Sequence, residues 1–169
     1  MADPGEKTFF DVGADDIQKE FDLNMRGTWL PSKVMTPLLI GQQGACVLNV
    51  SSMSAFTPLT RIPGYSGAKA GVSNFTQWLA TYLARSGVRV NAIAPGFFMT
   101  EQNHALQFNP DGTPTPRCAH IVDGTPMRRY GELKELIGAM LFLVDERAAS
   151  FVTGIVLPVD GGYSAFSGV

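Results

Sequence analysis

The fold is decided by a short apolar stretch, Ala45-Cys46-Val47-Leu48-Asn49-Val50. Such a run is typical of a strand buried on both faces of a parallel sheet, and residues 88–93 form a second run of the same kind. Between the two, residues 65–85 carry apolar side chains three and four positions apart, which is the spacing of one helix face. A strand, a helix and a strand in this order predict a right-handed crossover between two parallel strands.

The pattern continues on both sides of this unit. We expect a helix over residues 15–39 with a bend near Gly27 or Pro31, another helix over residues 132–144, and a last strand over residues 154–159. These elements predict an α/β domain with three parallel strands. Because so narrow a sheet would leave a long strand edge exposed, we expect a further part of the domain upstream.

Residues 97–130 form a long polar stretch that contains four prolines. Structureless segments of that length in compact domains are usually functional, so we predict a mobile lid over a ligand. We interpret His104 and His120 as polar residues of this loop. Neither has the spacing to Cys, Asp or Glu that a metal site needs, so no metal is predicted.

Composition limits the function classes. The chain has 169 residues, 45% hydrophobic and 17% charged, as expected of one globular domain or part of one. A net charge of −2 with scattered Lys and Arg gives no footprint for nucleic acid. Two cysteines make no disulfide framework, and no apolar segment has the length of a signal peptide core or a membrane span. We therefore expect a cytoplasmic protein that binds a small molecule.

Several polar residues are predicted to meet at one edge of the sheet, because ligands bind beyond the carboxyl ends of parallel strands. Ser51 and Ser52 end the first strand, and residues 95–96 (Pro-Gly) end the second. Tyr65 opens the helix between them, and Lys69 follows one turn later on the same face. Taken singly, each feature is more often an ordinary turn or an exposed helix face.

Together these groups suit proton transfer coupled to hydride transfer. A carbonyl oxygen that gains charge as hydride arrives needs a proton, but a phenol with a pKa of about 10 is a poor acid at neutral pH. A neighbouring ammonium favours the phenolate and lowers that pKa, and a serine hydroxyl can hold the substrate oxygen.

The motifs resemble those of the short-chain dehydrogenase/reductase family from about residue 15 to residue 162. Asn49-Val50-Ser51-Ser52 is similar to its strand-end serine motif, and Tyr65-Ser66-Gly67-Ala68-Lys69 to its Tyr-x-x-x-Lys signature, 13 positions after Ser52. Residues 89–100, Gly154 and the sequence Asp160-Gly161-Gly162 also fit. The resemblance implies a partial Rossmann-like, doubly wound parallel sheet consisting of the last three strands of such a domain.

The resemblance also implies the roles of individual residues. Tyr65 would be the general acid/base, and Lys69 would lower its pKa and hold the ribose hydroxyls of the cofactor. Ser52 would orient the substrate oxygen, and Asn24, at a kink in its helix, would position a water in the proton relay. The nicotinamide end of the cofactor would contact Pro95, Gly96, Phe98 and Thr100, with the backbone of Phe98 facing the carboxamide.

Residues 52–63, residues 94–103 and the tail from Tyr163 are similar to the mannonate/fructuronate-type oxidoreductases of this family. This resemblance implies a sugar acid as substrate. Because such a substrate carries a carboxylate, we expect a cation near the pocket, for which Arg61 and Arg117 are candidates. An ordinary exposed arginine is at least as good an interpretation of each. An acyl-carrier ketoreductase is disfavoured because the sequence shows no basic patch for an acidic carrier.

The chain departs from the family in one respect: it contains no Gly-x-x-x-Gly-x-Gly sequence to cradle the pyrophosphate. We therefore expect residues 1–169 to be the carboxyl-terminal part of the domain, without its dinucleotide-binding half. NAD(H) is favoured, and NADP(H) remains open because the residue that discriminates them is absent. The family's subunit contacts use the two helices before and after residue 45, which implies a homodimer or homotetramer. The alternative is a truncated, non-catalytic oligomerisation fragment.

Overall fold

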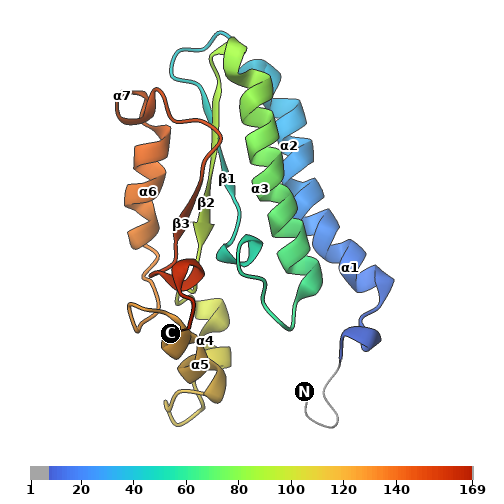
Figure 1. Cartoon of the computed structure of the whole chain (residues 1–169), viewed down its shortest axis with the longest axis vertical. Coiled ribbons are helices and arrows are strands. Elements are labelled where there is room, and N and C mark those ends of the chain that lie inside the picture. Colours follow the sequence, from blue (N-terminus) through green and yellow to red (C-terminus); the bar gives the residue numbers. More distant parts are fainter. Residues whose placement is uncertain (1–7, 169) are drawn as a thin grey trace.

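The computed structural model describes residues 8–168 and shows three parallel strands between two layers of helices (Figure 1). The strands are β1 (Cys46–Val50), β2 (Arg89–Pro95) and β3 (Val156–Val159), in the spatial order β1-β2-β3. The predicted α/β sheet is therefore confirmed, as is its parallel pairing, in which Val47 lies opposite Val90 and Ala92 opposite Val156.

Helix α3 (Pro63–Leu83) makes the predicted crossover between β1 and β2. Pro63 occupies its first turn, where a missing N–H costs nothing. Its apolar face packs on β2, and Gly87, at φ 76°, turns the chain into that strand in a left-handed conformation. The core on this side of the sheet consists of Ala45, Phe75, Leu79, Ala80, Leu83, Val88 and Val90.

The first helical region is continuous but not uniform. It consists of α1 (Ala14–Glu20), a π-helical segment (Phe21–Arg26), α2 (Gly27–Met35) and a 3-10 turn (Thr36–Leu38). The expected helix over residues 15–39 is thus present, and its irregularity is a π segment. Such segments insert an extra residue into a turn and are frequent at functional sites.

The opposite face of the sheet is covered by α6 (Glu135–Val144) and α7 (Glu146–Ala149). The carboxyl end of α6 is capped by Arg89, whose guanidinium is buried. It donates hydrogen bonds to the carbonyls of Leu143, at 2.7 Å, and Val144, at 3.2 Å. A cation at this end of a helix also meets the negative end of the helix dipole.

The prediction that residues 97–130 lack regular structure is wrong. They contain α4 (Glu101–Gln107) and α5 (Pro116–Gly124), so His104 and His120 are helical residues. Each helix is preceded by a capping threonine, Thr100 or Thr115, whose side-chain oxygen accepts a backbone N–H of the first turn. Both helices lie beyond the carboxyl ends of the strands (Figure 1). Short 3-10 turns complete the chain at Phe9–Asp11, Met53–Ala55, Ala84–Ser86 and Tyr163–Ala165.

Within residues 8–168, no helix combines the length and the apolar character needed to cross a membrane.

We predict that Arg89→Met lowers the free energy of unfolding by about 2 kcal/mol, because two carbonyls at the end of α6 lose a charged donor in a buried setting. Urea unfolding followed by circular dichroism measures this change. Arg85→Met, which removes an exposed arginine in the 3-10 turn after α3, is the control and should be nearly neutral. Equal stability of both variants would contradict the prediction.

Candidate active site

Tyr65 and Lys69 lie on the first two turns of α3, at the edge of the sheet where the strands end. The Lys69 ammonium nitrogen is 5.7 Å from the centre of the Tyr65 ring. It also donates a 2.9 Å hydrogen bond to the carbonyl of Val50, the last residue of β1. Burial lowers the pKa of Lys69 from its ordinary value. The structure therefore brings the predicted phenol and ammonium together.

Ser51 fastens the start of α3 to the end of β1. Its hydroxyl donates to the backbone carbonyl of Lys69 at 3.1 Å and lies 2.6 Å from the hydroxyl of Ser73. The main chain of Ser51 also donates to Ile93 of β2, at 2.8 Å. These bonds fix the position of the first turns of α3, which carry Tyr65 and Lys69, relative to the ends of the strands.

Ser52 is buried directly after β1. Its Oγ accepts hydrogen bonds from the main chain of Ser54, at 3.2 Å, and from the hydroxyl of Ser54, at 3.0 Å. Because Ser52 is the acceptor in both bonds, its own proton remains for a third partner.

Asn24 lies in the π segment. Its amide nitrogen donates to Glu20, both to the main-chain carbonyl at 3.0 Å and to the carboxylate at 2.9 Å. Asn24 and Lys69 line the same cavity, which has a volume of about 490 Å³ and lies against β1. Two members of the predicted catalytic set, distant in sequence, therefore share one space, and the tyrosine ring lies beside the second of them.

The end of β2 packs tightly against the end of β3. Gly96 donates to the carbonyl of Val159 at 2.9 Å, and a Cβ on Gly96 would lie 2.6 Å from Asp160. Only glycine fits so close to another backbone. Phe98 and Thr100 are then held by Asn103, which donates to the carbonyl of Phe98 at 2.8 Å and to which Thr100 is joined by a reciprocal capping box.

The two ends of the segment between β2 and α6 are hydrogen-bonded to each other. Phe98 pairs with Gly131, and Gly131 exchanges further hydrogen bonds with Phe97 and Met99. A Cβ on Gly131 would lie 2.5 Å from the ring of Phe98. Helices α4 and α5 therefore form a lobe that is joined to the sheet through this pairing and through Met127, whose N–H donates to the carbonyl of Gly161 after β3 at 3.1 Å.

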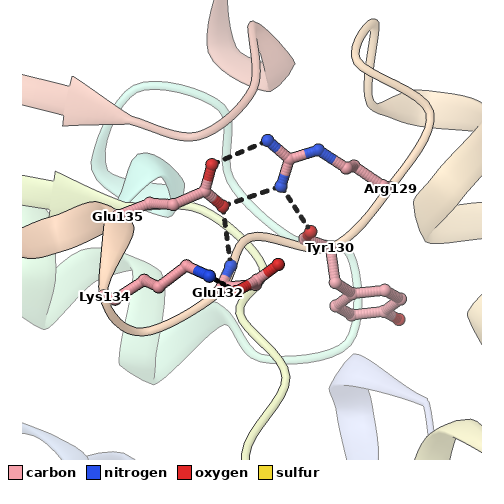
Figure 2. A network of polar contacts seen from close by, with 5 residues as sticks. All are labelled: Arg129, Tyr130, Glu132, Lys134 and Glu135. Atoms are coloured by element: carbon pink, nitrogen blue, oxygen red, sulfur yellow. Dashed lines mark hydrogen bonds and ion pairs between the residues drawn. The ribbon is translucent and has the colours of Figure 1, made fainter.

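Figure 2 shows the polar network of the residues on either side of Gly131. Arg129 donates two 2.7 Å hydrogen bonds to the carboxylate of Glu135, which also accepts the main-chain N–H of Glu132 at 2.8 Å. These bonds, chiefly those from Arg129, lower the pKa of Glu135 to about 2. This pair was not predicted from the sequence, because the two residues are six positions apart across a turn.

Arg61 and Arg117, the predicted substrate cations, line a second cavity of about 650 Å³. Arg61 reaches it from the loop before α3 and Arg117 from α5, and His120 lines it one turn after Arg117. Our sequence interpretation of His120 as a loop residue without a site missed this position. Its spacing from Arg117 signals a shared face only once α5 is known to be a helix.

A family model described as enoyl-(acyl carrier protein) reductase, one of the short-chain dehydrogenase/reductase models, matches residues 1–164. The chain belongs to the short-chain dehydrogenase/reductase family. An uncharacterised oxidoreductase of Haemophilus influenzae is 56% identical over 163 residues, which are 96% of this chain and 57% of that protein. A 3-oxoacyl-[acyl-carrier-protein] reductase of Synechocystis is 36% identical over 152 residues, 90% of this chain and 58% of that protein.

Two solved structures of the family are similar to this one. A provisionally assigned D-mannonate oxidoreductase of Haemophilus influenzae with bound NAD has a TM-score of 0.94 and 54% identity, covering 100% of this chain and 60% of that chain. A gluconate 5-dehydrogenase of Burkholderia cenocepacia, in complex with NADP and tartrate, has a TM-score of 0.82 and 27% identity. The match covers 95% of this chain and 60% of that chain. The chain thus spans less than two thirds of the length of each relative.

We predict that the stabilisation of the fold by the Arg129–Glu135 pair is lost as the pH falls through the acid range. A carboxylate whose pKa is lowered by folding stabilises the folded state at pH values above its ordinary pKa of 4.5. This contribution is lost as the pH falls toward the folded-state pKa of about 2. The melting temperature of the unmodified chain should therefore fall more steeply over that range than that of Glu135→Gln. Glu146→Gln, at an exposed carboxylate of α7, should follow the unmodified chain. Parallel curves for all three proteins would exclude this role.

Proposed function

We propose that this chain carries the proton-transfer machinery of an NAD(P)-dependent oxidoreductase that interconverts an alcohol and a ketone by hydride transfer. The observation that carries the proposal is the pairing of Tyr65 and Lys69 at the carboxyl edge of the sheet, with Lys69 anchored to Val50. The family and the relatives named as oxidoreductases support the same reaction class.

In the reduction direction, the Tyr65 hydroxyl gives its proton to the carbonyl oxygen as that oxygen becomes an alkoxide. The positive charge of the Lys69 ammonium stabilises the phenolate that remains. The proton of Ser52, which its two bonds to Ser54 do not use, orients the same oxygen. Asn24 faces the cavity beside Lys69 and holds the water through which Tyr65 is reprotonated.

The residues present fit the nicotinamide side of a dinucleotide. The half-buried Lys69 ammonium faces a cavity with room for a ribose, and the backbone of residues 95–100 is held rigidly at the end of β2. When bound, the dinucleotide supplies or accepts the hydride. We favour NAD(H), the cofactor in the Haemophilus influenzae structure, while the NADP of the Burkholderia cenocepacia enzyme keeps NADP(H) as the alternative.

The pyrophosphate side is not provided by residues 1–169, which contain no Gly-x-x-x-Gly-x-Gly sequence. We propose that these residues are the carboxyl-terminal part of the domain. The dinucleotide-binding half would then correspond to the portion of the relatives that the chain does not span. If no such half accompanies the chain, the alternative is a non-catalytic oligomerisation fragment.

For the substrate we propose a sugar acid of the D-mannonate/D-fructuronate type. The provisional assignment of the Haemophilus influenzae structure supports this class, and so does the presence of Arg61 and Arg117 around one cavity. A thioester on an acyl carrier is the second candidate, favoured by the family model and by the Synechocystis relative. Assays with a keto-sugar acid and with a 3-oxoacyl thioester separate the two.

Self-association through α2 and α3 is proposed as well, as a homodimer or homotetramer. The outer face of α3 exposes a stacked aromatic pair, Trp78 and Tyr82, with ring centres 5.2 Å apart. Large apolar side chains are also exposed on α2, among them Trp29 and Val34. Water-exposed aromatic and aliphatic side chains of this size favour an interface.

We expect Tyr65→Phe to lower turnover of a keto-sugar acid by a factor of about 10²–10⁴, because it removes the proton donor and keeps the ring. The assay uses the completed enzyme, meaning this chain joined to the amino-terminal region of the Haemophilus influenzae relative. Tyr82→Phe, which retains the exposed aromatic stack, is the matched control. Undiminished turnover by Tyr65→Phe would mean that the proton comes from another group.

A separate measurement tests the division of the cofactor site. By calorimetry, residues 1–169 alone should bind NADH far more weakly than the completed enzyme, because the pyrophosphate cradle is missing. Micromolar affinity of the isolated chain would contradict this. Absence of NADH binding by the completed enzyme as well would favour the non-catalytic alternative.

A further inference from the structure

We infer that Arg117 and His120 of α5 form the carboxylate-binding subsite of this enzyme, in the 650 Å³ cavity beside the start of α3. The inference rests on the proposed function and names two groups that select an acid over a neutral substrate. It also gives His120 a role that its place in the sequence did not suggest.

The lining of the cavity contains basic side chains. Two arginines and a histidine line it, and none of its lining residues in the described part of the chain is an aspartate or glutamate. Within residues 8–168, Arg117 and His120 have no ion-pair partner, whereas Arg128 and Arg129 of the same segment are paired with Asp123 and Glu135. The guanidinium of Arg117, which has no ion-pair partner among these residues, therefore suits an anionic ligand.

Helix geometry aligns the two groups. Arg117 and His120 are three positions apart on α5, so their side chains lie on one face, one turn apart. Pro116 and the Thr115 cap fix where this helix begins, because the Thr115 hydroxyl oxygen accepts the N–H of Cys118 at 3.2 Å. A guanidinium can bind a carboxylate through two parallel hydrogen bonds, which leaves the imidazole for a neighbouring hydroxyl.

The cavity is lined by segments that adjoin the proposed reacting groups along the chain. Its wall includes Ile62, three residues before Tyr65, and Phe97, the residue after Gly96. The loop that forms this wall is tied to α3 by a 3.3 Å hydrogen bond from the main chain of Leu59 to the hydroxyl of Ser66. A ligand held at α5 by its carboxylate would therefore extend its carbon chain toward Tyr65.

The test compares D-fructuronate with an uncharged keto-sugar of the same length, in the completed enzyme. Arg117→Met should raise KM for the acid by about 10–100-fold, the effect of losing a charged hydrogen bond, and should change kcat/KM for the neutral sugar far less. Arg117→Lys should recover part of the loss, and His120→Gln should have a smaller effect than Arg117→Met. Arg128→Met, at the neighbouring arginine paired with Asp123, is the matched control.

Equal effects of Arg117→Met on the acid and the neutral sugar would overturn the inference, as would no effect on either. Tighter binding of a sugar phosphate than of the acid would also overturn it. If the completed enzyme turns over no ketone, the proposed function fails. The subsite is then judged by ligand-observed NMR with D-mannonate: binding that Arg117→Met abolishes and Arg128→Met preserves supports it, and binding unaffected by Arg117→Met refutes it.

Discussion

The site depends on the hydrogen bonds that fasten the start of α3 to the end of β1. Ser51 holds the main chain of Lys69, and the Lys69 ammonium holds the carbonyl of Val50. Parallel strands cannot be joined by a tight turn, so α3 must run back along the sheet from the carboxyl end of β1 to the start of β2. The first turn of α3 therefore lies at the edge where the strands end. The crossover brings Tyr65 to that edge, and the two bonds set its position there.

The same edge is bordered by a lobe whose attachment is polar. Helices α4 and α5 are joined to the sheet through the pairing of Phe98 with Gly131, and the Arg129–Glu135 pair braces the return into α6. The sheet edge holds the proposed proton-transfer groups, and the lobe contributes α5 to the wall of the second cavity. The lobe is thus fixed both at the end of β2 and, through Met127 and Gly161, at the end of β3.

Much of the fold followed from periodicity, because the strands around Val47 and Val90 and the apolar face of α3 are strongly patterned. Helices α4 and α5 were missed because they are short and polar, although their threonine caps, Thr100 and Thr115, are visible in the sequence. The Tyr65–Lys69 pairing was predictable since it needs only one helix. The cavity that unites Asn24 with Lys69, and the place of His120, depend on packing between distant segments.

The unpaired edge of β1 lies beside the proposed cofactor site. Within residues 8–168, β1 pairs only with β2, so its other edge borders the cavity of Asn24 and Lys69, and Val50 remains half exposed. An open parallel strand edge is an incomplete structure that normally pairs or is covered. A segment that paired with it would also enclose the space beside the Lys69 ammonium, where the ribose is proposed to bind. One missing neighbour would therefore account for both the exposed strand and the open half of the cofactor site, which is why we propose that the two are completed together.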